Sequence, residues 1–533
     1  MSQQTAEMST ASAPESRPAK LTGREFYKSI GSPKYIVAPM VERSEFAWRM
    51  LTRSFMEKDQ PQRVLAYSPM FHARLFKESD GHRAQCIQPM RHDDQTDTDV
   101  PFLDGNPAID RPLFVQFCAN DPNDFLEAAR LAAPYCDAVD LNLGCPQGIA
   151  RKGHYGAFLQ EDWDLIYKLI NKLHTELPVP VTAKFRIQET KEKTLEYAKM
   201  ILSAGASIIT VHGRRREQKG HNTGVADWSY IRYLRDNLPP ETVIFANGNI
   251  LGQGDIERCL EATGADGVMS AEGNLSDPTI FGKVPEIGQE GREYWRGRDG
   301  RGGYRVDAVF RRYLNIIHDY VLRNPVPERK PLFLPSDPVD NTPEQTKNTQ
   351  NGTENSEHIN GKRKAEDDGH EKATEPPSKK QKRNNNVRVS DPNLTAMQGH
   401  LFQLLRSLVK EHTHIRDMLA RTRAGDIARF EQILSMVEDV VKEGLLAYEK
   451  NPEAFDKKPQ DAENLQGSQA TIAEYGRPWW VCQPYVRPLP EEAIAKGAMR
   501  VSKKDQKKAA EAAEAAAHSV FSKTEATPSA IST

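Results

Sequence analysis

Short apolar runs rich in β-branched residues recur through the first 285 residues of the chain, and longer amphipathic stretches separate them. The pattern contains eight such runs: 35–39, 63–67, 113–117, 137–142, 180–185, 207–212, 242–246 and 266–270. A run that is apolar on both faces is typical of a buried parallel strand, and most intervening segments are long enough for a crossover helix. Eight strand–helix units predict an α/β fold, a TIM (β/α)8 barrel over residues 31–285. A doubly wound open sheet would instead carry G-x-G-x-x-G after the first strand, and the segment after Pro39 has none.

The pattern changes after residue 285. Apolar residues spaced three and four apart predict helices over about 303–324, starting near Tyr304, and over about 394–450. Between them, residues 335–392 lack Phe, Tyr and Trp, so they bury too little apolar surface to offset the entropy of ordering. We therefore predict a small all-α helical domain formed by residues 286–334 and 393–450, with 335–392 as a long, basic, disordered insertion.

The two ends of the chain are expected to add little to either core. Residues 1–30 are predicted to form a disordered N-terminal tail and residues 500–533 a C-terminal tail, because both are polar or of low complexity. Residues 451–499 include an aromatic and proline-rich stretch around Trp479 and Trp480, which we interpret as an ordered strap over the helical core.

Composition and cysteine spacing narrow the class of protein. Lysine and arginine total 72 against 74 aspartates and glutamates, which gives a net charge of -2. This near-neutral total hides local clusters of basic residues. The six cysteines form no C-x-x-C pair, which argues against a zinc site or a disulfide framework and favours a reducing compartment: Cys86, Cys118, Cys136, Cys145, Cys259 and Cys482. No stretch approaches about 18 apolar residues, so we expect neither a membrane span nor a secretory signal. We expect a monomer without a metal site, located in the cytoplasm, the nucleus or both.

Polar or glycine-rich segments follow the carboxyl end of most predicted strands, where barrel enzymes gather their active sites. Each residue alone has a structural explanation: Gln116 could satisfy a buried backbone group, and His212 could be a hydrogen-bonded core histidine. Their recurrence after successive strands indicates one shared site. The candidates, in chain order, are Pro39, Met40 and Val41; Gln116; Asn142 and Cys145; Lys184 and Arg186; His212; Asn247, Gly248 and Asn249; and Ala271 and Glu272.

Cys145 stands out among these candidates. Gly144 and Pro146 fix the backbone on either side and leave the thiol displayed at a strand terminus, a placement that favours chemistry over packing. Gly248 and Gly273, in the last two strand loops, offer backbone N–H groups at the place where barrel enzymes hold a phosphate. The chain has no Walker motif and no H-E-x-x-H, which argues against NTP hydrolysis and zinc proteolysis.

Together these motifs resemble the tRNA-dihydrouridine synthases over about residues 33–330, most closely the eukaryotic branch that reduces D-loop uridines 16 and 17. The resemblance rests on 38–44 (APMVERS), 113–117 (LFVQF), 140–147 (DLNLGCPQ), 182–186 (TAKFR), 212–214 (HGR) with 226–228 (ADW), 247–249 (NGN) and 271–273 (AEG). One position departs from the bacterial members, which usually have a Gly-Arg pair in place of Ala271-Glu272. No arginine side chain is therefore expected on the flavin phosphate there, which leaves backbone N–H groups and the His212 region for that task.

The resemblance implies an FMN-containing oxidoreductase that uses NADPH or NADH. Hydride passes from flavin N5 to uracil C6, and Cys145 gives a proton to C5, which suits a thiol because it is protonated near about pH 7. Asn142, Lys152 and Arg186 are assigned to the uridine substrate. The residues implied to bind FMN are Pro39, Met40 and Val41 at the ring, Gln116 and Lys184 at its polar edge, and His212, Asn247, Gly248, Asn249, Ala271 and Glu272 at the ribityl chain and phosphate.

Arginine-rich stretches in the predicted helical domain favour phosphate contacts to tRNA over a merely solvated surface, and Arg311 and Arg312 are the chosen candidates. Whether the strap also touches RNA stays open. Two basic clusters in the insertion, Lys362–Lys364 and Lys379–Arg383, resemble a bipartite signal for a nuclear-import receptor; a solvated linker and weak RNA attraction are the alternatives.

Two other functions fit part of the pattern. A flavin-dependent dehydrogenase of a free pyrimidine, of the dihydroorotate or dihydropyrimidine type, would need no basic helical domain. A catalytically inactive RNA-binding module would need neither Cys145 nor Lys184.

Overall fold

The computed structural model describes residues 20–57, 64–220, 223–338, 391–455 and 467–486, together with residues 488 and 492. The basic clusters Lys362–Lys364 and Lys379–Arg383 lie outside the described residues, as does most of the predicted insertion. The import signal therefore stays a prediction. The monomeric state and the location of the protein also stay predictions. One part of the predicted N-terminal tail is structured: Gly23–Ser29 form helix α1, because Phe26 and Tyr27 are buried against the barrel.

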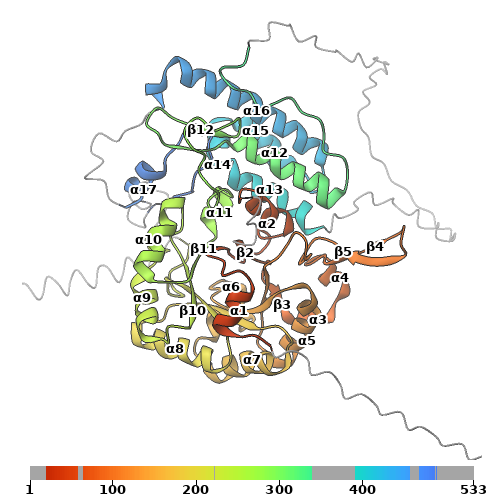
Figure 1. The fold of residues 1–533 in the computed structure, drawn as a ribbon, viewed down its shortest axis with the longest axis vertical. Helices are drawn as coiled ribbons and strands as arrows, with labels where there is room; N and C mark the ends of the chain where they lie inside the picture. The colour runs from red at the N-terminus through yellow and green to blue at the C-terminus, as the bar shows by residue number, and fades with distance from the viewer. Residues whose placement is uncertain are drawn as a thin grey trace, which may run out of the picture.

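Among the described residues, eight parallel strands close into a barrel, as the apolar runs predict (Figure 1). They are β1 (Tyr35–Val37), β2 (Val64–Tyr67), β6 (Leu113–Cys118), β7 (Ala138–Leu143), β8 (Val181–Arg186), β9 (Ile208–His212), β10 (Val243–Asn247) and β11 (Gly267–Ser270). They pair in this order, and β11 pairs with β1, which closes the cylinder. A short strand β3 (Phe71–His72) pairs with β6, and β4 (Met90–Asp93) and β5 (Thr98–Pro101) form a hairpin that projects from the body (Figure 1).

Helices surround the barrel, and the longer ones bury an apolar face on it. Helix α7 (Trp163–Glu176) shows the pattern, since Ile166, Leu169, Ile170 and Leu173 recur at three- and four-residue spacing and are fully buried. The other barrel helices are α2 (Phe46–Arg53), α3 (Ala73–Glu78), α4 (Asp80–Ala84), α5 (Pro122–Ala132), α6 (Gly148–Lys152), α8 (Lys191–Ser203), α9 (Trp228–Asn237), α10 (Gln253–Thr263) and α11 (Glu272–Ser276), with single turns at Ala133–Tyr135 and Gly156–Leu159.

A second, mostly helical region follows the barrel and begins with an antiparallel hairpin, β12 (Tyr294–Arg296) and β13 (Gly302–Tyr304). Its helices are α12 (Val306–Ile316), continued by the π-helical turn η5 (Ile317–Leu322), then α13 (Pro392–Leu404), α14 (Arg406–Glu411), α15 (Thr413–Arg421), α16 (Ile427–Lys450), the turn Pro452–Ala454 and α17 (Gly467–Tyr475). Within the described ranges, no helix is both long and apolar enough to cross a membrane.

One detail of the two predicted helical stretches is wrong, and the structure refines another. Tyr304 lies in strand β13 and pairs with Tyr294, so the helix predicted from about residue 303 begins at Val306. The stretch predicted over 394–450 is four helices, broken at Leu405, at His412 and at 422–426. The apolar spacing continues across these breaks because all four helices bury a face in the same core.

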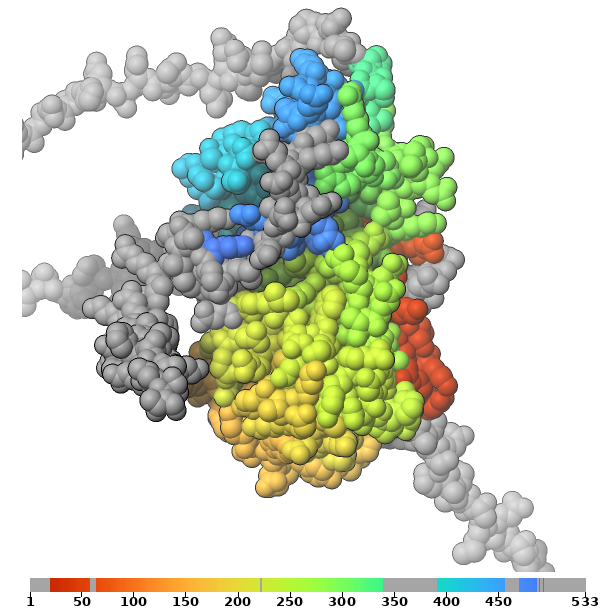
Figure 2. Space-filling view, turned by 90° about the vertical axis from the view of Figure 1, so that its left-hand side faces the viewer, coloured from red at the N-terminus to blue at the C-terminus, as the bar shows by residue number. Residues whose placement is uncertain are grey.

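Helix α2 joins the two regions. Trp48 and Leu51 of this barrel helix belong to the hydrophobic core of the helical region, together with residues of α12, α13 and α16. The strap residue Trp480 is fully buried in the same core. Figure 2 shows the helical region, coloured green to blue, stacked on the barrel. Because α2 follows β1 and α11 follows β11, and both contact the helical region, this region covers one side of the barrel's carboxyl end.

Candidate active site

Three neighbouring strands are joined by a buried hydrogen-bond network centred on Asp140. Gln116 on β6 donates from Nε2 to Asp140 Oδ2 at 2.8 Å, and Thr182 on β8 donates from its hydroxyl to Asp140 Oδ1 at 2.7 Å. Asn142 on β7 donates in turn to Gln116 Oε1 at 2.7 Å. Burial raises the pKa of Asp140 to about 6, although the Thr182 and Gln116 hydrogen bonds favour its charged form. This hydrogen-bond network fixes the orientation of the Gln116 and Asn142 amides.

The same hydrogen-bond network positions Cys145. Asn142 Oδ1 accepts hydrogen bonds from the backbone N–H groups of Gly144 (3.0 Å) and Cys145 (2.9 Å), which folds the strand end into a tight turn. Gly156 approaches this turn with a φ of 64°, and a Cβ there would lie 2.8 Å from the Cys145 carbonyl oxygen. The Cys145 side chain is partly exposed, whereas its neighbour Cys118 is buried, and burial raises the pKa of Cys118 to about 12. Of these two neighbouring cysteines, Cys145 is the one whose side chain is partly accessible.

Lys184 stands beside Asn142, with which it pairs in the β7–β8 register. Burial lowers the pKa of Lys184 to about 8, and the positive charge of Arg186 acts in the same direction. Asp140 and Cys145 oppose this shift. The ammonium group is thus a poorly solvated cation, which an electron-rich ligand over the strand ends would stabilise.

Arg214 forms a positive corner of the site next to the imidazole of His212. Burial, followed by the charges of Arg186 and Lys184 and then of Arg214, holds the pKa of His212 well below its ordinary value, so the imidazole is neutral. Arg214 Nη1 lies 3.1 Å from His212 Nε2, which assigns the acceptor role to Nε2 and the ring proton to Nδ1. Arg214 Nη2 also donates to Asn249 Oδ1 at 2.5 Å.

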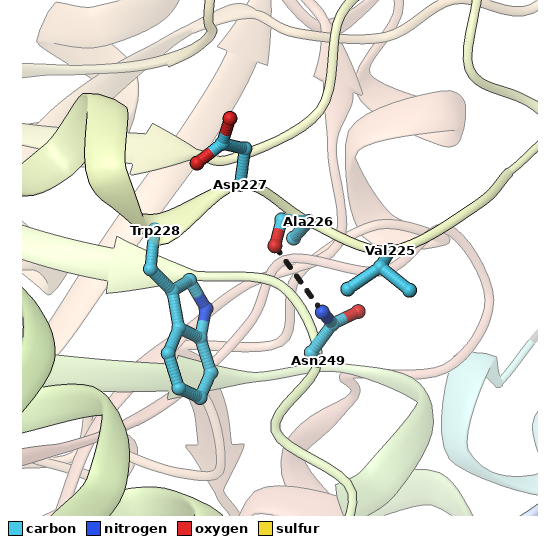
Figure 3. A pocket seen from close by; sticks show the side chains of 5 residues that line it. All are labelled: Val225, Ala226, Asp227, Trp228 and Asn249. Carbon is cyan, nitrogen blue, oxygen red and sulfur yellow. Dashed lines mark hydrogen bonds between the residues drawn. The ribbon is translucent and has the colours of Figure 1, made fainter. Parts of the chain in front are cut away.

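The loops after β9 and β10 meet at Gly248. Its φ of 112° and its surroundings require glycine, since a Cβ would lie 2.7 Å from the Ala226 Cβ and 3.0 Å from His212 Cδ2. Trp228 donates from Nε1 to the Gly248 carbonyl oxygen at 2.9 Å. Figure 3 shows the hydrogen bond from Asn249 Nδ2 to the Ala226 carbonyl oxygen. These loops border a pocket of about 420 Å³ lined by Val225, Ala226, Asp227, Trp228 and Asn249 (Figure 3).

The remaining barrel candidates also follow strand ends. Met40 follows β1, and its N–H donates to the Ser44 hydroxyl oxygen at 3.0 Å, while the next residue, Val41, is exposed. Ala271 and Glu272 follow β11, and Glu272 is exposed at the start of α11. The structure thus brings Pro39 and the other predicted flavin-binding residues to the same end of the barrel as Cys145.

The residues predicted to bind RNA are spread more widely. Lys152 is exposed at the end of α6. Arg311 donates from Nε and Nη2 to Glu438 Oε1 at 2.9 and 2.6 Å, and Arg312 pairs with Glu293. These ion pairs tie α12 to α16 and to the segment before β12. The assignment of both arginines to tRNA phosphates stays a prediction.

Three residues of the site lie within the quoted sequence motifs but receive no role from the sequence: Asp140, Thr182 and Arg214. Asp140 precedes Asn142 by two positions on β7, so the alternation of side chains along a strand places both on one face. That signal was available in the sequence. The contacts of Arg214 with His212 and Asn249 depend on how two loops fold together, and no local pattern predicts them. Within the described residues, no group of His, Cys, Asp and Glu side chains is placed to hold a metal ion.

The chain is similar to proteins of known name. A family model described as dihydrouridine synthase (Dus) matches residues 36–296, nearly the whole barrel. A Schizosaccharomyces pombe protein named tRNA-dihydrouridine(16/17) synthase, whose name specifies NAD(P)(+), is 41% identical over 478 residues, covering 90% of this chain and 94% of its own length. The Saccharomyces cerevisiae protein of the same name is 42% identical over 474 residues, or 88% of this chain and 87% of its own. A Mus musculus protein with that name and the suffix "-like" is 46% identical over 279 residues, or 52% and 54% of the two chains.

Proposed function

Because this chain belongs to the dihydrouridine synthase family, we propose that it reduces the C5=C6 bond of uridines 16 and 17 in tRNA to 5,6-dihydrouridine, with NAD(P)H as the reductant. The observation that carries this proposal is the strand-end arrangement in which Asn142 holds the Cys145 turn beside Lys184. A dehydrogenase of free pyrimidines would not require the helical region that packs on the barrel. Conversion of uridine in unmodified tRNA by the purified protein tests the proposal.

We propose FMN as the resident cofactor, because the residues at the strand ends fit its polar groups. Lys184 is a poorly solvated cation, and the buried Gln116 amide is held by Asp140 and Asn142, which leaves it one N–H for a ligand. Arg214, bonded to His212 and Asn249, supplies positive charge that Glu272 does not. When bound, FMN supplies the hydride that reaches uracil C6. The residues that would hold it are Pro39, Met40, Val41, Gln116, Lys184, His212, Asn247, Gly248, Asn249, Ala271 and Glu272.

The proton for uracil C5 comes from the chain itself. Cys145 carries it at Sγ on a partly exposed turn. Asn142 holds this turn in shape, since its Oδ1 accepts hydrogen bonds from two backbone N–H groups and one of its amide hydrogens is donated to Gln116. Its predicted contact with uracil therefore rests on the remaining amide hydrogen.

FMN affinity is expected to fall as the pH rises through about 8. The pKa of Lys184 is lowered from 10.5 to about 8, so its ammonium group is charged below that pH and neutral above it. Loss of this charge weakens the attraction for the electron-rich edge of the flavin, and the dissociation constant rises by up to about tenfold per pH unit above about pH 8. Titration of FMN fluorescence over a series of pH values measures the effect.

A pair of lysine variants identifies the group responsible. Lys184→Met binds FMN weakly with a flat pH profile, whereas Lys172→Met, which removes a lysine paired with Glu176 on the barrel exterior, keeps the wild-type profile. A wild-type dissociation constant that stays level between about pH 7 and 9 rules out Lys184 as the cation at the flavin.

Replacing Arg311 and Arg312 together with alanine is expected to weaken tRNA binding and to flatten its salt dependence by about one log–log unit for each phosphate that the variant no longer neutralises. The phosphates would compete with Glu438 and Glu293 for these arginines. FMN content stays unchanged, because the flavin site lies in the barrel. Arg130→Ala is the matched control, since Arg130 pairs with Glu176 on α7. If the double variant and this control have the same salt slope, the two arginines serve the helical core and not RNA.

A further inference from the structure

The backbone on both sides of Cys145 is held by long cationic side chains. Lys219 donates from Nζ to the Pro146 carbonyl oxygen at 2.6 Å, across 73 residues of sequence. Arg186 donates from Nε to the Gly144 carbonyl oxygen at 2.7 Å. Residues 144 and 146 are the immediate neighbours of Cys145, so each flank of the thiol turn has its own anchor.

The same arginine ties this turn to the segment that carries Lys219. Residues 214–219, here called the brace, follow β9. Arg186 donates from Nη1 to the carbonyl oxygens of Arg215 (3.1 Å) and Gln218 (3.3 Å), and its side chain is buried. One guanidinium therefore joins the brace to the Cys145 turn. These bonds also explain structurally why an arginine stands at position 186, whose predicted contact with the substrate stays a prediction.

A third contact reaches Cys145 from the far side of its loop. Arg216 of the brace donates from Nη1 to the Ala157 carbonyl oxygen at 3.3 Å, and the Ala157 N–H donates to the Cys145 carbonyl oxygen at 3.1 Å. The Phe158 ring lies under both cations of the brace, 5.3 Å from the Arg216 guanidinium carbon and 5.8 Å from Lys219 Nζ. The side chains of Arg216 and Lys219 thus pack on the Phe158 ring beside the turn.

We propose that Lys219 is a positioning residue for Cys145, which holds the thiol turn in place through the Pro146 carbonyl. This inference rests on the proposed function, in which Cys145 protonates uracil C5. Placement within a fraction of an ångström decides the rate of such a transfer, and a misplacement of about 1 Å costs on the order of 10²-fold. Lys219 itself does not touch the reacting atoms; it acts on them through the backbone of the turn.

Alkylation of Cys145 in the absence of tRNA tests the brace directly. Lys219→Met removes the donor and keeps the apolar stem on Phe158, so the turn opens more often and iodoacetamide reacts with Cys145 several-fold faster than in the wild type. Peptide mass spectrometry measures the rate at Cys145, with Cys86 as an internal reference. Lys219→Arg, which restores a charged donor, returns the rate toward wild type. Lys199→Met, which removes an exposed lysine on α8, leaves it unchanged.

A kinetic readout completes the test. In single turnovers of the NADPH-reduced holoenzyme with tRNA, Lys219→Met slows product formation by about 10- to 100-fold, while the tRNA dissociation constant and the rate of flavin reduction stay at wild-type values. An unchanged alkylation rate overturns the proposal. So does a defect confined to weaker, less salt-dependent tRNA binding, which would make Lys219 a phosphate contact. The alkylation arm decides the role of Lys219 even if the wild-type protein forms no dihydrouridine, which would refute only the proposed function.

Discussion

Replacing Cys145 with alanine lowers the rate of dihydrouridine formation by about 10²-fold or more, the usual effect of removing a general acid. The effect is large because the partly exposed Cys145 side chain is the thiol at the strand ends, while the neighbouring Cys118 is buried and its raised pKa of about 12 reflects that burial. Reduction of the bound flavin by NADPH proceeds at the wild-type rate, since that half-reaction does not use the thiol. Stopped-flow absorbance separates the two half-reactions.

Cys86→Ala is the matched control for this variant, because Cys86 is the other partly exposed cysteine among the described residues. It forms dihydrouridine at the wild-type rate. FMN and tRNA affinities of both variants equal those of the wild type, since neither thiol is assigned to binding. Wild-type product formation by Cys145→Ala would remove Cys145 from the mechanism.

Replacing Trp480 with alanine destabilises the protein by about 3–5 kcal/mol, the usual cost of truncating a fully buried tryptophan. Its ring centroid lies 5.8 Å from that of Trp295 and 5.0 Å from that of Phe455, so the strap completes the core of the helical region. The Trp480 carbonyl oxygen also accepts from the Val306 N–H at 2.9 Å, which fixes the start of α12. Denaturant unfolding monitored by circular dichroism measures the loss.

Trp480→Phe provides the comparison within the same site. Trp480 Nε1 has no hydrogen-bond partner among the described residues, so phenylalanine removes an unsatisfied donor and keeps most of the aromatic surface. This variant is therefore expected to lose much less stability than Trp480→Ala. Equal stability of Trp480→Ala and the wild type would place the strap outside the core.

The barrel could be predicted from the sequence because its signal is local. A strand covered on both faces is apolar throughout, so the run at 113–117 corresponds to β6, Leu113–Cys118, within one residue. The helical region was predicted only as two helical stretches, without its division into separate helices. The breaks at Leu405 and His412 carry no glycine or proline, and α13 to α15 keep burying residues in one core, so the apolar spacing does not reveal them.

The candidate site likewise contains residues that the sequence reveals and residues that it does not. Cys145, Lys184 and His212 could be found because each lies at or just after the end of a predicted strand. Arg214 and Lys219 were missed as contributors, because their partners, Asn249 and Pro146, come from other loops. Sequence periodicity carries no information about such contacts, which form only when the loops after β7, β9 and β10 fold over the same end of the barrel.

The most direct test of the proposed function uses the purified, FMN-loaded protein, NADPH and an unmodified tRNA transcript that has uridines at positions 16 and 17. Nuclease fragments of the product are examined by mass spectrometry for the gain of two hydrogens on a uridine. The proposal predicts dihydrouridine at positions 16 and 17, formed with consumption of NADPH and abolished by heat denaturation of the protein. Reduction of free uracil or uridine with no change in the tRNA would contradict it and would favour a dehydrogenase of free pyrimidines.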